Sequence, residues 1–292
     1  MDKLFLVFNI SLAVTVFCYG LTAQHFNDIR YMWQHPRLTL LSLVAMYILT
    51  PVLGLVLAET IDMPIPAKVA IVAISLSMIP PLLPQKELQA GGRGSYGIGL
   101  VIVTALLAPI GIPALVAFLG KLMNRPYGVS PIHIGVIVLE LVIAPLVAGV
   151  LVGWLLPLRI TGPVQKYAPK AASTLTLIAL VLLLIAVAPV IWKGATGWIL
   201  LAGVLFNVGG LAIGHLIAGP NRVHAVVLAL SCASRHPAIA FTIARESYPG
   251  KNIAAAAITV LVLNGIICGW YVKWQRKRTG PTAEQVAASS TP

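Results

Sequence analysis

The residues with the clearest chemical potential lie in the stretch Ser231–Pro237, inside an otherwise apolar segment from Val223 to Ile243. This stretch contains Arg235 and His236 at the point where a membrane helix is normally most apolar. Because a charged or polar group costs free energy in a bilayer, such groups face the protein interior or a water-filled cavity and usually serve a function. The sequence therefore predicts a functional site at this interruption.

Arg235 has two alternative roles. It lies just before a predicted half-helix, 238–246, which begins at Ala238. The amides and the dipole at a helix N-terminus favour an anion, and a fixed guanidinium beside them would add to that preference. The alternative is structural: an ion pair, or hydrogen bonds to carbonyls freed in another broken helix. One arginine can serve both roles, so the sequence leaves both open.

Two other groups are candidates for carrying a coupling proton. His236 is an imidazole and could titrate near neutrality, although burial beside Arg235 favours a neutral, hydrogen-bonding ring. Glu140 is a lone carboxylate well inside its apolar segment, where it should either pair with a cation or bind a proton. Arg235 and a cavity connected to bulk water are its two alternative partners.

A second interruption, Ile79–Pro84, breaks an apolar run in the first half of the chain. Broken apolar segments in both halves are typical of a transporter's binding site. We expect Pro84 and Gln85 to lie near the place where the broken helices cross. Gln85, Lys86 and Glu87 could line a cytoplasmic-facing cavity or form an ordinary solvated helix end; both stay open for Gln85, and we assign Lys86 and Glu87 to the solvated end. The small polar residues that border the breaks are the remaining candidate substrate ligands: Ser77, Ser231 and Ser234.

The composition is that of an integral membrane protein. Of the 292 residues, 59% are hydrophobic and 10% are charged, whereas a soluble protein carries about 25% charged residues. The net charge of +12 comes from residues between apolar segments, which indicates contact with an anionic lipid leaflet rather than with nucleic acid. Three cysteines without paired spacing predict neither a disulfide framework nor a metal site: Cys18, Cys232 and Cys268.

Apolar segments long enough to span a bilayer need about 20 residues. The sequence predicts nine, at roughly 4–22, 38–58, 65–90, 95–120, 131–156, 170–191, 196–217, 222–246 and 252–274. Lys and Arg are more numerous on the side that holds the C-terminal basic cluster, so we expect a multi-pass inner (plasma) membrane protein with its N-terminus outside and its C-terminus in the cytoplasm. Residues 1–278 would form one transporter unit, and residues 279–292, rich in Ala, Ser, Thr and Pro, are predicted to be disordered.

The two halves of the chain can be superposed as an inverted repeat. The first repeat (4–120, lacking its first helix) pairs with the second (131–274), and the broken segment occupies the same slot in both. Matching segments are an odd number of spans apart, so they would cross the membrane in opposite directions. Chance pairing is the alternative, because kinking prolines are common in membrane helices.

The sequence resembles the bile acid:sodium symporter family. The resemblance rests on two motifs, Ile79–Pro84 followed by Ala90–Leu100, and Ala233–Ala240, and it extends over nearly the whole chain. It implies a core domain in which two broken helices cross at mid-membrane, a smaller panel domain, and alternating access for an organic anion. Bacterial members of this family commonly have ten spans, so the first of these would be missing here.

The sequence departs from the family pattern at the crossing. The resemblance places the family's acidic position near Ser231 and its Gln-Asn pair on Arg235 and His236, and no carboxylate lies between Arg222 and Arg245. Sodium coupling is therefore in doubt. We interpret the Arg235 guanidinium as supplying the positive charge that sodium supplies in relatives. Coupling could then use protons, through Glu140 or His236, use sodium held by backbone oxygens, or be absent.

The sequence thus favours a secondary transporter of an organic anion over an enzyme. The substrate's carboxylate or sulfonate would bind near Arg235. A membrane-embedded sensor or enzyme without transport is the alternative, but its only candidate reactive groups are Cys232, Ser234 and His236. These lie almost consecutively beside Arg235, which is poor geometry for catalysis. No cofactor is predicted other than the doubtful sodium ion.

Overall fold

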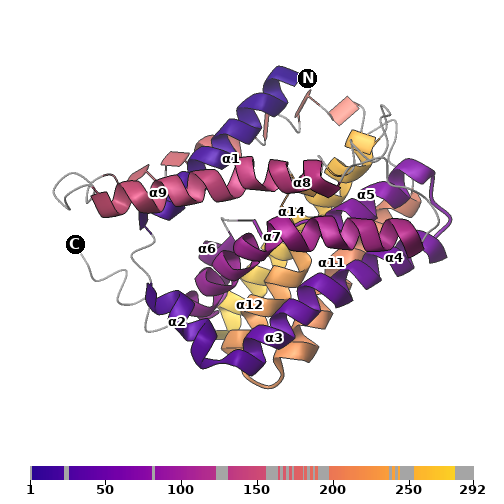
Figure 1. The fold of residues 1–292 in the computed structure, drawn as a ribbon. Coiled ribbons are helices and arrows are strands. Elements are labelled where there is room, and N and C mark those ends of the chain that lie inside the picture. Colours follow the sequence, from indigo (N-terminus) through magenta and orange to yellow (C-terminus); the bar gives the residue numbers. More distant parts are fainter. Residues whose placement is uncertain are drawn as a thin grey trace. The chain divides into compact units, whose positions relative to one another are not determined.

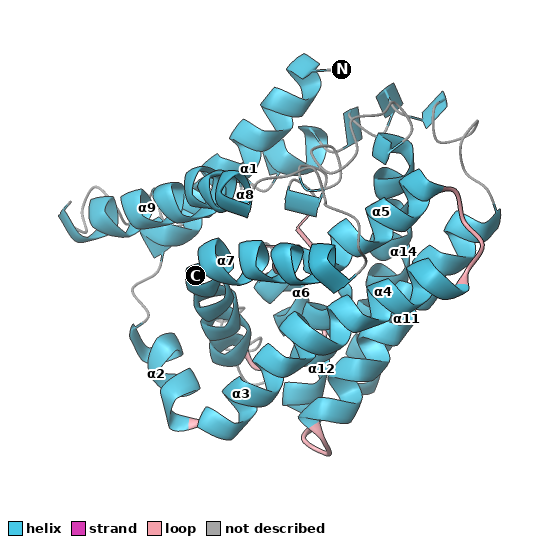
Figure 2. Cartoon of the chain, turned by 45° about the vertical axis from the view of Figure 1, so that its right-hand side comes forward, coloured by secondary structure: helices cyan, strands magenta, loops and turns pink. Residues whose placement is uncertain are grey.

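The computed structural model describes residues 2–22, 26–80, 83–122, 131–155, 197–236 and 253–279, with shorter stretches between 164 and 189 and between 239 and 243. All regular structure in these ranges is helical, as Figure 2 shows. The chain divides into two compact units, which we call unit 1 (residues 1–26 and 105–194) and unit 2 (residues 27–104 and 195–292).

Unit 2 contains both interrupted segments. Its elements are α2 (Phe26–Gln34), α3 (Pro36–Val44), the π-helical turn η1 (Ala45–Leu49), α4 (Thr50–Thr60), α5 (Ile65–Leu76), α6 (Leu83–Gln89), the first part of α7 (Gly94–Leu122), α11 (Gly197–Ala218), α12 (Arg222–Ala233) and α14 (Ile253–Thr279). Helix α2 lies between two predicted spans, where no helix was predicted. It forms because Tyr31 and Met32 bury their side chains in the hydrophobic core of this unit.

Unit 1 consists of α1 (Asp2–Thr22), the remainder of α7, α8 (Pro131–Val138), the π-helical turn η2 (Leu139–Ile143) and α9 (Ala144–Leu155), besides shorter stretches. Helices α1 and α9 pack closely where two glycines meet. A Cβ on Gly20 would lie only 3.0 Å from the Cα of Gly149. Small residues of this kind allow close backbone contact between membrane helices.

The helices agree with a protein that crosses the membrane several times. Four are long and apolar enough to do so by themselves, within Pro36–Thr60, Gly94–Phe118, Gly197–Ala218 and Ala256–Arg278. Four shorter apolar helices lie at other predicted spans: Leu6–Cys18, Ile65–Leu76, Leu139–Leu155 and Arg222–Ala233. The predicted span 170–191 is only partly described. The nine-span count and the inverted repeat therefore stay predictions.

The first predicted break is present, and its prolines explain it. Helix α5 ends at Leu76, and Ser77 is extended (φ −70°, ψ 157°). A proline has no N–H for the carbonyl four residues before it and clashes with that carbonyl. Pro80 and Pro81 therefore free the carbonyls of Leu76 and Ser77. Helix α6 restarts at Leu83, so Pro84 lies in its first turn, where a missing N–H costs nothing.

The second break follows the same rule. Helix α12 ends at Ala233, and Ser234 is extended (φ −85°, ψ 130°). The sequence places a proline at 237, so the Ala233 carbonyl has no intrahelical donor. That carbonyl instead accepts a hydrogen bond from Asn264 Nδ2 on α14, at 2.9 Å. The half-helix predicted for 238–246, including Ala238, lies almost entirely outside the described residues.

A tight, glycine-rich turn joins α6 to α7. Gly91 has φ +84°, a left-handed conformation that side-chain-bearing residues rarely adopt. The Gly92 N–H donates to the carbonyl of Glu87 at 2.8 Å and closes the end of α6. This turn brings the start of α7 back against α6.

Helices α11 and α12 lie side by side along much of their length (Figure 1). Gly214 makes this packing possible, because a Cβ there would overlap backbone atoms of Leu228 and Ala229. We expect Gly214→Ala to lower the free energy of unfolding by about 1–3 kcal/mol or more, since backbone atoms cannot rotate away. Thermal unfolding of the detergent-purified protein measures this effect.

The matched control for that substitution is Gly265→Ala on α14, where a Cβ would meet no atom within 4 Å. Alanine is also the better helix former. This variant should unfold at or above the wild-type temperature. An equal loss of stability in both variants would mean that α11 and α12 do not approach each other as closely as described.

Candidate functional site

The two breaks meet each other inside unit 2. The backbone N–H of His236 donates to the carbonyl of Met78 at 2.7 Å. The Arg235 side chain donates through Nη1 to the carbonyl of Ser77 at 2.9 Å. Residues 77–78 of the first break and 235–236 of the second are therefore directly connected. The predicted crossing of two whole broken helices stays a prediction, because the half-helix after the second break lies almost entirely outside the described residues.

Arg235 is buried, with 3% of its surface exposed. Its bond to Ser77 satisfies a carbonyl that Pro81 has freed, so the structural role that the sequence left open is present. Nε and Nη2, however, have no hydrogen-bond acceptor among the described residues, and no carboxylate there forms an ion pair with this guanidinium. A buried cation with unpaired donors is costly, so the structural role uses only part of this side chain.

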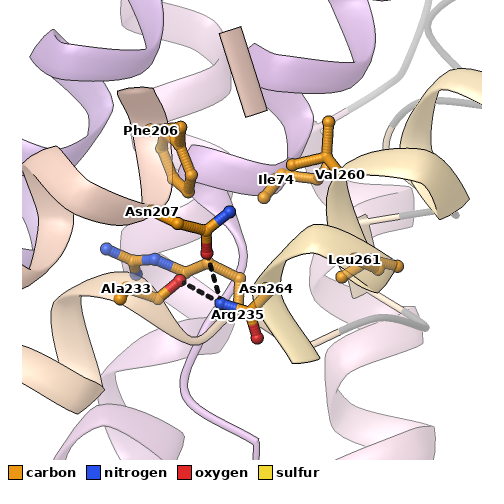
Figure 3. A pocket seen from close by; sticks show the side chains of 8 residues that line it. All are labelled: Ile74, Phe206, Asn207, Ala233, Arg235, Val260, Leu261 and Asn264. Carbon is orange, nitrogen blue, oxygen red and sulfur yellow. Dashed lines mark hydrogen bonds between the residues drawn. The ribbon is translucent and has the colours of Figure 1, made fainter. Parts of the chain in front are cut away.

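The side chains beside Arg235 leave a small pocket that has no room for a water molecule in the conformation described. Figure 3 shows the side chains that line it: Ile74, Phe206, Asn207, Ala233, Arg235, Val260, Leu261 and Asn264. Pockets for drug-sized ligands measure about 300–1,000 Å³. An acidic group could therefore bind beside Arg235 only after this pocket widens.

Two asparagines fix the polar wall of this pocket. Asn264 Nδ2 donates to Asn207 Oδ1 at 2.5 Å and to the Ala233 carbonyl at 2.9 Å, as the dashed lines in Figure 3 show. Asn207 Nδ2 in turn donates to the Gly203 carbonyl on its own helix at 2.7 Å. Asn207 lies on α11 and Asn264 on α14, both away from the two breaks in the sequence. Their proximity to Arg235 could not be read from their spacing.

Glu87 contradicts its sequence interpretation. Only 1% of its surface is exposed, so the predicted solvated helix end is wrong at this residue. Helix periodicity explains the error: Glu87 is four residues after the buried Leu83 and shares its face. Gln85 and Lys86, on the other face of α6, are exposed. Glu87 Oε1 accepts a hydrogen bond from Ser231 Oγ on α12 at 2.8 Å.

The other predicted site residues occupy different environments. Ser234 Oγ is buried and donates to Cys268 Sγ at 3.7 Å, and Ser77 Oγ donates to the Ile74 carbonyl at 2.9 Å, so both hydroxyls are used locally. His236 is buried, and neither ring nitrogen has a partner among the described residues. Pro84 is buried within α6. Glu140 belongs to unit 1, where its side chain is exposed in η2.

The chain was compared with models of known protein families. The model described as the sodium bile acid symporter family matches residues 9–196. The chain belongs to this family. Its members are transporters, so an enzyme is not indicated for this symporter-family protein. A search of curated proteins found no match.

The Arg235 guanidinium beside the Ser77 carbonyl does not fit the sodium ion that the family name implies. The Ser77 carbonyl, a potential oxygen ligand, already accepts from the Arg235 guanidinium, whose charge would repel a cation. No group of three or more His, Cys, Asp or Glu side chains in the part of the chain that the structure describes could hold a metal ion. The symporter therefore has a fixed cation at this crossing.

Proposed function

We propose that this protein is a secondary active transporter that moves an organic anion by alternating access, with Arg235 as the binding group for the anion. Family membership supports a transporter of the symporter type. The observation that carries the anion proposal is Arg235: it is buried, it lines the pocket, and its Nε and Nη2 have no acceptor among the described residues. An intramembrane charge in such a place marks a substrate or ion pathway.

The chemistry of the pocket favours a carboxylate or a sulfonate. A guanidinium can donate two parallel N–H bonds to the two oxygens of such a group, which gives both orientation and affinity. Asn207 and Asn264 extend the polar wall beside it. The remainder of the wall is apolar, with Ile74, Phe206 and Val260, and suits the carbon atoms adjacent to the acidic group.

Transport without sodium follows from the same arrangement. In relatives that use sodium, the ion brings positive charge to the crossing; here Arg235 supplies it permanently. The anion would then bind without a co-bound metal ion. We expect the driving force to come from the substrate's own gradient or from protons.

Uptake into proteoliposomes tests this function. Radiolabelled cholate, taurocholate, benzoate and lactate would be offered separately, with either a sodium gradient or a pH gradient imposed. We expect at least one of these anions to accumulate above protein-free vesicles under the pH gradient with no sodium present. Uptake that requires sodium would contradict the sodium-free mechanism. Absence of both uptake and ligand-induced thermal stabilisation for all four anions would contradict anion transport.

A further inference from the structure

The carboxyl group of Glu87 is the most unusual polar group in unit 2 that the anion site does not use. Its Oε1 accepts from Ser231 Oγ at 2.8 Å, while Oε2 is buried without any hydrogen-bond partner among the described residues. The residue lies on α6, directly after the first break, and its side-chain donor among the described residues, Ser231, lies on α12, just before the second break. The two broken helices thus enclose this carboxyl group between them.

Among the described residues, no basic group forms an ion pair with Glu87. The titratable groups on the neighbouring helices do not donate to it either: Tyr96 on α7, Arg222, His224 and Cys232 on α12, and Cys268, Tyr271, Lys273, Arg276, Lys277 and Arg278 on α14. Tyr96 instead pairs with Ser42 at 2.6 Å. Lys86, the adjacent residue on α6, is exposed. Arg235, the buried cation of this unit, bonds the Ser77 carbonyl and forms no ion pair with Glu87 in the described part of the chain.

Oε2 lacks a hydrogen-bond partner among the described residues, and neighbouring atoms also close the space around it. Gly97 on α7 faces this oxygen, and a Cβ at that position would overlap it. An ionised carboxylate in such a place loses its water and gains only one hydrogen bond, which makes the charged form very costly. A proton on Oε2 removes the charge and leaves Oε1 as the carbonyl oxygen that accepts from Ser231.

We propose that Glu87 is the proton-binding site of this transporter and that its proton is co-transported with the anion held by Arg235. The proposal rests on the proposed function and adds the coupling ion. In each cycle one proton moves from water on the donor side to Glu87 Oε2 and leaves to water on the acceptor side. The enclosed state forms only with the proton bound, because otherwise a bare carboxylate would be buried.

This assignment differs from the two proton sites that the sequence suggested. His236 lies next to Arg235, so a second cation there would be repelled. Glu140 is exposed in unit 1 and has no enclosing partner comparable to Ser231. Glu87 alone of the three combines burial, a fixed hydrogen bond and contact with both broken helices.

Infrared difference spectroscopy tests proton binding independently of transport. The detergent-purified full-length protein would be titrated across the neutral pH range while the C=O stretch of protonated carboxyl groups is recorded. We expect a band that is lost in Glu87→Gln and kept in Glu59→Gln, a control at an exposed carboxylate near the end of α4. In Ser231→Ala the band should shift to higher frequency, because the carbonyl oxygen loses its donor. No band assignable to Glu87 would overturn the proposal, since the carboxyl group would then stay ionised.

Uptake tests the coupling. Glu87→Gln keeps an acceptor for Ser231 and mimics the protonated form, so the variant should still exchange labelled for unlabelled anion. Under a pH gradient, however, the inside concentration should only reach the outside concentration, whereas the wild type exceeds it. Accumulation by Glu87→Gln equal to wild type would overturn the coupling role. If the wild type itself transports none of the four anions, the proposed function fails, while the infrared result still decides whether Glu87 binds a proton.

Discussion

Arg235→Gln is expected to weaken anion binding by about 10- to 100-fold, because a hydrogen bond to a charged group contributes about 1.5–3 kcal/mol and each 1.4 kcal/mol is a factor of ten. Glutamine removes the charge and the paired donors that would face the anion. It can still donate to the Ser77 carbonyl, so the contact between the two breaks is partly kept. The concentration dependence of initial uptake measures the loss, using the anion that the wild type transports.

Two further variants separate charge from packing at this position. Arg235→Lys keeps the charge but loses the planar fork, so its affinity should lie between those of wild type and Arg235→Gln. Lys86→Gln removes an exposed cation from α6 and should leave uptake unchanged. Wild-type affinity in Arg235→Gln would show that this guanidinium serves only to stabilise the Ser77 carbonyl.

Both breaks could be located from the sequence because proline acts locally. The loss of an N–H and the clash with the carbonyl four residues earlier are properties of the chain itself. What the sequence could not show is which donors satisfy the freed carbonyls. Arg235, which follows the end of α12, donates to the Ser77 carbonyl. Asn264 on α14 donates to the Ala233 carbonyl. These partners are distant in sequence, and only tertiary packing brings them together.

The interpretation of Glu87 failed for a related reason. A charged residue next to Gln85 and Lys86 is interpreted as part of a polar helix end when only its sequence neighbours are considered. The available signal was spacing: Glu87 follows Leu83 by one helical turn and therefore shares its buried face. Even so, burial required the glycine turn after α6, which folds Gly97 of α7 onto the carboxyl group. The structural preferences of single residues do not predict this packing of α7 against α6.

The buried charges at the crossing complement each other in function without touching. Arg235 stays charged and retains unpaired donors for an anion, while Glu87 retains an unpaired oxygen for a proton. A direct ion pair between them would neutralise both and remove the need for either ligand. Under the proposed mechanism, their separation would allow one anion and one proton to be carried together, with no net charge added to the occupied transporter.

The combination of Gly97→Ala and Glu87→Ala is expected to show strong non-additivity in thermal stability. In the wild-type background, the new methyl group at residue 97 overlaps Glu87 Oε2. We expect a loss of about 1–3 kcal/mol from this overpacking. When Glu87 has been shortened to alanine, the same methyl group enters the vacated space, so Gly97→Ala should cost little or should stabilise.

The coupling energy of this double-mutant cycle reports whether the two residues touch, because contacting residues show coupling of about 0.5–3 kcal/mol and distant ones add within about 0.5 kcal/mol. Thermal unfolding of the four detergent-purified proteins provides it, with Gly265→Ala in both backgrounds as the control for helix propensity. Additive effects would mean that Gly97 does not close the space over Oε2. Glu87 would then have room for water or a counter-ion, and its carboxylate could be buried without binding a proton.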